Sequence, residues 1–240
     1  MDTDQLRWPV IRKPLDVWKE DKISKKTISR IVGCGAIWIC RHGNRIDFVD
    51  PSWQGTDPYL ADDGIVQAKE TGIRLREEGI QHIFASPFLR TIETAHHIAE
   101  AVDLSVKIEH GVCEWLNPKW FTEPPTFVPL DERRRRFPRI DDTYESIIYP
   151  KFPETIEELK ARCRKAALNL ADAYRSSFLV VSHGIPVGRF AQGLLGDQRD
   201  ISSGLCALTK VNRGDGNAIL ELNGDVSHLS GGEEHRDKLN

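Results

Sequence analysis

Short apolar runs alternate with longer stretches in which apolar residues recur every three or four positions along most of this 240-residue chain. The short runs predict buried strands, and the periodic stretches predict amphipathic helices. Strands are expected at 36–40, 80–85, 106–108, 178–182, 206–211 and 218–222, and helices at 62–78, 89–102, 155–173 and 187–195. Because strands and helices alternate, we predict an α/β fold: a three-layer α/β/α sandwich with a mostly parallel central sheet.

Two of the predicted helices have recognisable starts. Thr155 and Glu158 have the spacing of a capping box, which marks the start of the longest predicted helix. Ser86 and Pro87 follow the second predicted strand, and we expect them to cap and to open the next helix. This junction would place Arg90 near a helix start.

Composition divides the chain into an arm, one large domain and a short tail. Residues 1–33 are rich in Lys and Arg without clear periodicity, so we expect a basic, partly ordered extension. Residues 34–230 are expected to form one domain, and 231–240 a polar tail. Within the domain, 116–152 is rich in Pro and aromatic residues and lacks periodicity, which is typical of a lid. The arginine run 133–136 in this segment either gathers an anionic substrate or forms a solvated face.

Composition and charge exclude several classes of protein. Hydrophobic residues make up 40% and charged residues 29%, as in an ordinary soluble globular protein. The net charge of -3 gives no reason to expect a nucleic acid or a membrane as partner. No apolar run approaches the roughly 20 residues of a membrane span. The five cysteines are scattered and have no C-x-x-C spacing, so we expect reduced thiols and a cytoplasmic or nuclear location.

The first predicted strand ends in a cluster of reactive side chains. His42 follows the strand and is flanked by Arg41 and Arg45, at the carboxyl end of a strand, where open α/β sheets bind ligands. Two permanently charged, planar guanidiniums suit a phosphate dianion. They also disfavour protonation of the histidine, and a neutral imidazole keeps a lone pair for nucleophilic attack. The alternative is a histidine satisfied by a backbone carbonyl, beside two solvated arginines.

Further polar side chains arrive at other strand ends. Arg90 follows the second strand, and Glu114 follows the third. His183 and Gly184 come directly after the fourth strand, with another helix opening behind them. Because a helix start presents free backbone N–H groups, an anion would be favoured there. The sequence therefore predicts that several strand ends surround one anion.

Four motifs carry a resemblance to a known family. They are, in this order, Arg41-His42-Gly43, Ser86-Pro87-x-x-Arg90, Glu114-Trp115 and Ser182-His183-Gly184. Over residues 36–223 the chain resembles the histidine phosphatase, or phosphoglycerate-mutase-like, superfamily, branch 1. Residues 40–47, Thr94-Ala95-His96 and Glu114-Trp115 are similar to the phosphatase domain of suppressor-of-T-cell-receptor-signalling proteins and ecdysteroid-phosphate phosphatases. That branch typically has a glutamate where this chain has Asn44.

The resemblance implies a metal-independent phosphomonoester hydrolase without a cofactor. His42 would attack phosphorus and hold the phosphoryl group as a covalent intermediate. The side chains that would bind the phosphoryl oxygens and stabilise transition-state charge are Arg41, Arg45, Arg90 and His183. Glu114 would protonate the leaving oxygen and then activate water. Glu109 or Glu123 would serve as the acid if the loop folded differently.

Two other functions fit the same motifs. A phosphoglycerate mutase typically continues the first motif as Arg-His-Gly-Glu-Ser, whereas Asn44 and Arg45 follow here. A binding or scaffold module would hold a phosphate without turnover, and similar domains occur in a subunit of a polymerase III transcription factor. A homodimer is left open, because no motif indicates one.

The substrate is expected to be a phosphorylated small molecule or a phosphoprotein. The branch suggests phosphotyrosine or another aromatic or bulky phosphomonoester. Trp115, Trp120 and Phe121 lie after the third predicted strand and would stack on an aromatic ring, although aromatic residues in a loop are as often local core.

Overall fold

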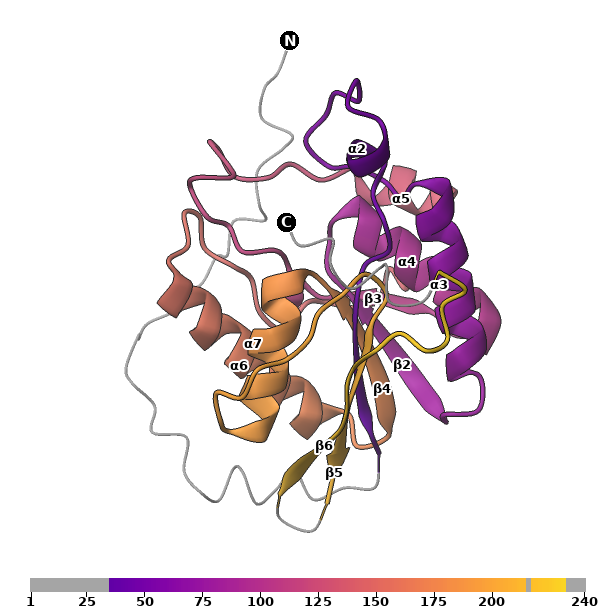
Figure 1. The fold of residues 1–240 in the computed structure, drawn as a ribbon. Coiled ribbons are helices and arrows are strands. Elements are labelled where there is room, and N and C mark those ends of the chain that lie inside the picture. Colours follow the sequence, from indigo (N-terminus) through magenta and orange to yellow (C-terminus); the bar gives the residue numbers. More distant parts are fainter. Residues whose placement is uncertain (1–34, 215–216, 232–240) are drawn as a thin grey trace.

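The structure is a computed structural model, and it describes residues 35–214 and 217–231. The extension predicted at 1–33 and all but the first residue of the tail predicted at 231–240 lie outside the described residues. Within the described part, strands and helices alternate and build three layers (Figure 1).

A sheet of six strands forms the middle layer of the described part, in the order β3-β2-β4-β1-β5-β6. The strands are β1 (Ile37–Arg41), β2 (Ile80–Ala85), β3 (Val106–Ile108), β4 (Ser177–Ser182), β5 (Leu208–Arg213) and β6 (Ala218–Asp225). The first four pair in parallel, whereas β5 runs antiparallel to both β1 and β6. The predicted mostly parallel α/β sandwich is confirmed.

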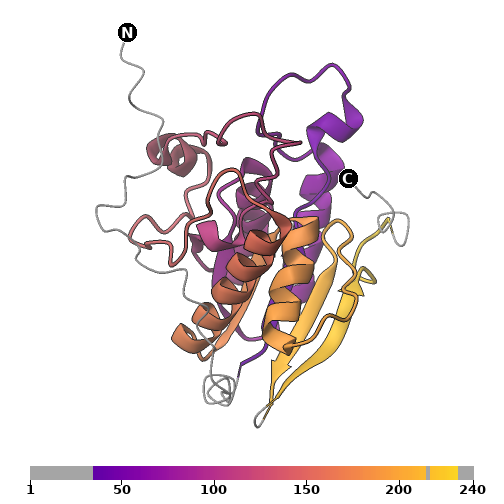
Figure 2. The same ribbon diagram turned by 90° about the vertical axis from the view of Figure 1, so that its left-hand side faces the viewer.

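Helices cover both faces of this sheet. They are α2 (Ile46–Val49), α3 (Asp62–Leu75), α4 (Leu89–Val102), α5 (Leu130–Arg136), α6 (Ile156–Ala173) and α7 (Gly184–Leu195), with a 3-10 turn at η2 (His110–Val112). α3 and α4 lie on one face (Figure 1), and α6 and α7 lie side by side on the other (Figure 2). The predicted capping box of Thr155 and Glu158 opens α6.

β1 is buried on both faces, which explains its unbroken apolar run. Trp38 and Cys40 pack into the cluster formed with α3 and α4. Ile37 and Ile39 pack into the cluster formed with α6 and α7. Because burial of one such side chain is worth about 1.5–3 kcal/mol, the strand that leads to the reactive cluster is firmly held by the core.

β2, β3 and α4 have the bounds expected from the sequence, but the capping residue of α4 and the start of α7 differ. The N-cap of α4 is Phe88, so Ser86 and Pro87 precede the helix and do not open it. α7 begins at Gly184, three residues before the expected start. His183 has an extended backbone and takes the N-cap position, so the helix starts immediately after the β4 strand tip.

The remaining differences concern short elements. β5 begins at Leu208 because Cys206 has a left-handed backbone with φ 51°, which interrupts an extended strand. β6 runs to Asp225, beyond the expected end at 222. A four-residue helix, α2, lies between β1 and α3, where the sequence pattern predicts neither a helix nor a strand.

The stretch between β3 and α6 extends beyond the carboxyl edge of the sheet, as the loop around α2 does (Figure 2). It includes α5, and the arginine run forms the last turn of that helix. One buried carboxylate, that of Glu109, anchors the stretch. Its donors are the N–H groups of Gly111 and Ile147 and the hydroxyls of Tyr144 and Ser146, at 2.6–2.9 Å.

Within residues 35–214 and 217–231, no helix has the length and apolar character that crossing a membrane requires.

Candidate active site

Backbone contacts on both sides fix the tip of β1. The N–H of His42 donates to the carbonyl of Ser182 at 3.0 Å, which ties the tip to that of β4. Gly43 follows, and a Cβ built on it would lie 2.6 Å from the carbonyl oxygen of Gly64 in α3. A side chain at Gly43 would therefore force β1 and α3 apart, so the sequence requires glycine at this close approach.

The backbone also sets the tautomer of His42. Its Nδ1 lies 2.8 Å from the carbonyl oxygen of Gly43. A carbonyl oxygen can only accept a hydrogen bond, so in the neutral ring Nδ1 carries the proton. Nε2 is then unprotonated and keeps its lone pair. His42 is almost fully buried, with 1% of its surface exposed, which excludes bulk water from this lone pair.

His183 lies beside His42, as the sequence predicts. The two ring centroids are 5.4 Å apart and the ring planes meet at 63°. Nε2 of His183 is 2.7 Å from the hydroxyl of Ser86, and Nδ1 is 3.3 Å from Oε2 of Glu114. The ring of Phe88 packs edge-on against the imidazole at 5.1 Å. The second histidine is thus fixed by contacts with three other segments.

Three arginines contribute positive charge to the same place. Arg41 ends β1, and its Nη1 donates to the carbonyl of Ser203 at 3.1 Å. Arg45 lies 3.1 Å from the carboxylate of Asp47, and its Nε is buried without a hydrogen-bond partner. Arg90 stands in the first turn of α4 with 3% of its surface exposed, and its Nε also lacks a partner. Buried guanidinium donors without acceptors indicate a site built for an anion.

Glu114 is the acid that joins this cluster. Its Oε2 is 3.5 Å from Nη2 of Arg90 and 3.3 Å from Nδ1 of His183. Its Oε1 accepts the N–H of Trp115 at 3.0 Å. The carboxylate is mostly buried, with 9% of the residue exposed. The Glu114 carboxylate therefore lies beside a guanidinium and an imidazole of the cluster.

The two other acids considered from the sequence do not reach the cluster. Glu109 is fully buried, and its oxygens accept hydrogen bonds from the stretch between β3 and α6. Glu123 is exposed on the surface of that stretch. Of the three, only Glu114 contacts an arginine and a histidine of the cluster.

Burial and positive charge keep both imidazoles neutral. Burial, followed by the charges of Arg90 and Arg41, lowers the pKa of His42 well below its ordinary value of 6.5. Burial and Arg90 lower the pKa of His183 in the same way. Burial also lowers the pKa of Arg45 to about 10, which leaves this guanidinium charged at neutral pH. The cluster therefore holds three cations around a neutral imidazole.

Two residues of the site were not found from the sequence. Asp57 accepts the N–H of Leu89 at 2.9 Å and lies 3.5 Å from Nη1 of Arg90. Burial raises its pKa to about 6, against the opposing charge of Arg90. Ser86 was expected to cap α4 but contacts His183 instead. In sequence Asp57 is only a turn residue before proline, so nothing local signals its role.

Asn44, where the chain departs from the resembling branch, has both side-chain polar atoms engaged away from the cluster. Nδ2 donates to Asp63 at 2.7 Å, and Oδ1 accepts the N–H of Arg45 at 3.1 Å. The residue is completely buried. Asn44 therefore fixes the chain after the β1 tip to the first turn of α3.

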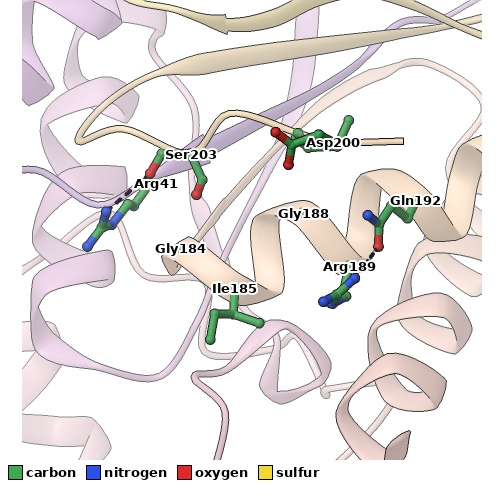
Figure 3. A pocket seen from close by; sticks show the side chains of 9 residues that line it. Arg41, Gly184, Ile185, Gly188, Arg189, Gln192, Asp200 and Ser203 are labelled. Atoms are coloured by element: carbon green, nitrogen blue, oxygen red, sulfur yellow. Dashed lines mark hydrogen bonds between the residues drawn. The ribbon is translucent and has the colours of Figure 1, made fainter. Parts of the chain in front are cut away.

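A cavity of about 200 Å³ lies beside Arg41, along α7 (Figure 3). Gly184, Ile185 and Ser203 line it close to Arg41, and Arg189 lines it further along the helix (Figure 3). The cavity borders one of the three guanidiniums.

The aromatic residues expected near the pocket differ in position. Phe121 packs against Phe88, whose ring also contacts His183. Trp115 donates from its indole nitrogen to the carbonyl of Glu154, and Trp120 packs against Trp115 with 49% of its surface exposed. Of these three residues, only Phe121 contacts a ring that itself contacts His183.

Among the residues that the structure describes, no group of three or more His, Cys, Asp or Glu side chains is arranged to hold a metal ion. The four described cysteines are buried free thiols, and Cys34 lies outside the described residues.

The family model of the histidine phosphatase superfamily (branch 1) matches residues 37–225. The chain belongs to this superfamily. The match spans β1 to β6 and so includes every residue of the cluster. The resemblance predicted from the four motifs is confirmed.

Three relatives match this histidine phosphatase superfamily member over different parts of its length. It is 30% identical over 156 residues to human ubiquitin-associated and SH3 domain-containing protein A, covering 58% of this chain and 23% of that protein. It is 29% identical over 206 residues to probable phosphoglycerate mutase GpmB of Erwinia tasmaniensis, covering 80% and 94%. It is 26% identical over 248 residues to the transcription factor tau 55 kDa subunit of Saccharomyces cerevisiae, covering 82% and 57%. The chain thus spans less than a quarter of the first relative.

A solved structure shares the fold. The crystal structure of ecdysone phosphate phosphatase from Bombix mori in complex with tungstate superposes with a TM-score of 0.65 at 20% identity. The superposition covers 80% of this chain and 93% of that one. The phosphoglycerate-mutase-like architecture expected from the sequence is therefore confirmed.

Proposed function

We propose that this protein is a metal-independent phosphomonoester hydrolase that acts through a phosphohistidine intermediate. One observation carries the proposal: the lone pair on Nε2 of His42 is buried and unprotonated among three guanidiniums. Such a site attracts a phosphate dianion and offers it a nucleophile. The proposal makes Arg41, Arg45, Arg90 and His183 the ligands of the phosphoryl oxygens.

In the first step, Nε2 of His42 attacks phosphorus, and the bond from phosphorus to the ester oxygen breaks. Glu114, in its protonated form, gives its proton to the leaving oxygen. The guanidiniums stabilise the charge that accumulates on the equatorial oxygens. The proton stays on Nδ1 of His42, hydrogen-bonded to the carbonyl of Gly43, so the phosphorylated ring carries a positive charge next to the negatively charged phosphoryl oxygens.

In the second step, the Glu114 carboxylate takes a proton from water while the water oxygen attacks phosphorus. The bond from phosphorus to Nε2 breaks, its electron pair returns to His42, and inorganic phosphate leaves. Glu114 is again protonated, so the cycle closes without a metal or a redox cofactor.

The test is hydrolysis of p-nitrophenyl phosphate with a chelator present. His42→Ala removes the nucleophile, so turnover is expected to fall on the order of 10⁴-fold. The matched control is His97→Ala, a histidine on α4 that pairs with Glu100. Mass spectrometry of rapidly quenched wild-type protein is expected to show one added phosphoryl group, absent from His42→Ala. Unchanged turnover in His42→Ala ends the proposal.

A phosphoglycerate mutase is a second candidate, because the similarity to probable phosphoglycerate mutase GpmB extends over 94% of that protein. Incubation with 3-phosphoglycerate and a bisphosphate primer separates the two functions. A mutase interconverts the phosphoglycerates, whereas a phosphatase releases inorganic phosphate. The absence of the Glu-Ser continuation after Gly43 favours the phosphatase.

A binding module without turnover is the third candidate, and the similarity to the tau 55 kDa subunit favours it. Titration calorimetry with phosphate and with a phosphotyrosine peptide tests it. Tight binding by wild-type protein, together with no hydrolysis of any ester, would support this function and oppose the first.

For the substrate, we propose an aromatic or bulky phosphomonoester such as phosphotyrosine. Supporting this choice, Phe48 and Tyr59 around α2 and Trp120 and Tyr149 in the opposite stretch are 37–49% exposed. These two stretches extend beyond the edge of the sheet where the cluster lies. A higher kcat/KM for phosphotyrosine than for phosphoserine is expected, and the reverse order would oppose this assignment.

A further inference from the structure

A buried ion pair lies behind the loop that carries Glu114. Arg162 of α6 is 6% exposed and Glu154 is 2% exposed. Nε and Nη2 of Arg162 donate to the two carboxylate oxygens of Glu154 at 2.7 and 2.8 Å, in the bidentate geometry that fixes both partners. Arg162 meets the cluster at the backbone carbonyl of Glu114.

The remaining donors of Arg162 hold the loop itself. Nη1 donates to the carbonyls of Gly111 and Cys113 at 2.9 and 3.1 Å, and Nη2 donates to the carbonyl of Glu114 at 3.1 Å. All five N–H donors of the guanidinium are therefore used, three of them on the backbone just before and at Glu114.

Glu154 holds the other side of the same loop. Its N–H donates to the carbonyl of Leu116 at 2.9 Å, and its own carbonyl accepts the indole N–H of Trp115 at 2.9 Å. The N–H of Leu116 is 3.4 Å from its carboxylate. Residues 113–116 belong to no helix or strand, so these contacts replace a regular backbone ladder.

We propose that Arg162, held by Glu154, is the positioning residue that aims the Glu114 carboxylate at the leaving oxygen. The inference rests on the proposed hydrolase function. The carbonyl that Arg162 grips belongs to Glu114 itself, so a shift of the guanidinium moves the acid's own main chain. General acid catalysis needs the carboxyl within hydrogen-bond reach of the leaving oxygen, and a displacement of about 1 Å is costly.

The role predicts a dependence on the leaving group. Phenyl phosphate releases a phenolate that, like tyrosine with its pKa of about 10, requires protonation as it leaves. p-Nitrophenyl phosphate releases a much weaker base that departs without this help. A misplaced acid therefore slows the first ester more than the second, whereas general loss of structure slows both equally.

The experiment compares kcat/KM for the two esters in wild type, Arg162→Lys and Glu154→Gln. kcat/KM is chosen because it reports steps up to phosphorylation of His42 and not the later hydrolysis. Lysine at position 162 keeps the positive charge but lacks the planar guanidinium with its five N–H donors. Glutamine at position 154 keeps the shape of the side chain but loses the negative charge and one acceptor oxygen. Each variant is expected to lower kcat/KM about 100-fold for phenyl phosphate and less than about 3-fold for p-nitrophenyl phosphate.

Arg213→Lys is the matched control. Arg213 ends β5, is 8% exposed, and donates to the carbonyls of Gly35, Ala171, Tyr174, Arg175 and Ser176 at the opposite edge of the sheet. The Arg213→Lys variant loses a comparable set of contacts to backbone carbonyls, but far from Glu114. Any fall in kcat/KM is therefore expected to be the same for both esters.

The outcomes separate the inference from the function it rests on. Wild-type protein that hydrolyses neither ester overturns the proposed function and the inference with it. The inference alone is overturned if the wild type is active and Arg162→Lys and Glu154→Gln lower kcat/KM equally for both esters. It is also overturned if they lower kcat/KM for neither ester. If circular dichroism shows that Arg162→Lys does not fold, Glu154→Gln decides. Glu154→Asp keeps the charge and is expected to recover much of the kcat/KM for phenyl phosphate that Glu154→Gln loses.

Discussion

The two sides of the candidate active site are built in different ways. His42 and His183 follow neighbouring parallel strands whose last residues, Arg41 and Ser182, are paired in register. Glu114 instead lies in irregular chain, and the side chains of Arg162 and Arg90, from distant segments, contact it. The histidine side is positioned mainly by the backbone of the sheet, and the Glu114 side largely by polar side chains.

This difference separates the expected effects of substitution. The strand tips are packed on both faces by the apolar core, so changing one polar side chain there removes its chemistry without moving its neighbours. The acid loop packs through Cys113 and Leu116 into a small separate apolar cluster, and Arg162 and Glu154 supply many of its hydrogen bonds. A change behind the loop is therefore expected to act on Glu114 without touching the phosphate.

Among substitutions that keep His42, the largest effect is expected on the strand side, from Arg41→Met. This change removes a guanidinium from the anion site and leaves the β1 backbone intact. kcat/KM is expected to fall on the order of 10³-fold for every phosphomonoester, because stabilisation of the phosphoryl oxygens does not depend on the leaving group. Steady-state assays with phenyl and p-nitrophenyl phosphate measure it. A loss confined to one ester would break the contrast between the two sides.

A smaller and selective effect is expected on the acid side, from Glu114→Gln. Glutamine keeps the size of the side chain but provides no acidic proton. kcat/KM for phenyl phosphate is expected to fall about 10²-fold or more, with a much smaller fall for p-nitrophenyl phosphate. The controls are Glu109→Gln and Glu123→Gln assayed with both esters; if either produced the selective loss, a different acid would be in use.

The smallest effect concerns stability and pH. His42 and His183 have pKa values well below 6.5 in the folded protein, whereas the unfolded chain takes up protons near 6.5. Stability is therefore expected to fall as the pH drops below about 6.5, by up to about 1.4 kcal/mol per pH unit for each buried imidazole. Asp57, whose pKa is raised to about 6, opposes this trend below that pH, because the folded state then binds the extra proton.

Urea unfolding between pH 7.5 and 5.5 measures this dependence in wild type and in His42→Gln. The variant lacks one of the two imidazoles, so its loss of stability over this interval is expected to be smaller by about 1.4 kcal/mol. An equal loss in both proteins would mean that His42 is not held neutral by its surroundings.

The strand side could be predicted from the sequence because its causes are local. The apolar runs of β1 and β4 locate the strands, and the polar residues that follow them must meet at one edge of a parallel sheet. The sequence therefore predicts the strand ends at which Arg41, His42 and His183 lie.

The acid side could not be predicted to the same depth because its causes are distant. Arg162 lies on a helix 48 residues beyond Glu114, where its spacing suggests only an amphipathic helix. Asp57 reaches Arg90 from a loop 32 residues before Leu89, whose N–H it accepts. Neither partner carries a local signal, so the sequence left the choice among three acids open.

The contact between Gly43 and Gly64 limits how this site can change over generations. A Cβ on Gly43 would meet the carbonyl of Gly64, and a Cβ on Gly64 would lie 2.2 Å from the carbonyl of Asn44, so each bare backbone requires the other. A lineage cannot exchange one of these glycines and adjust the second later, because the first exchange already displaces the chain next to His42. Drift in substrate preference is thus directed to the loops around the rim, where side chains can vary while the reactive imidazole keeps its place.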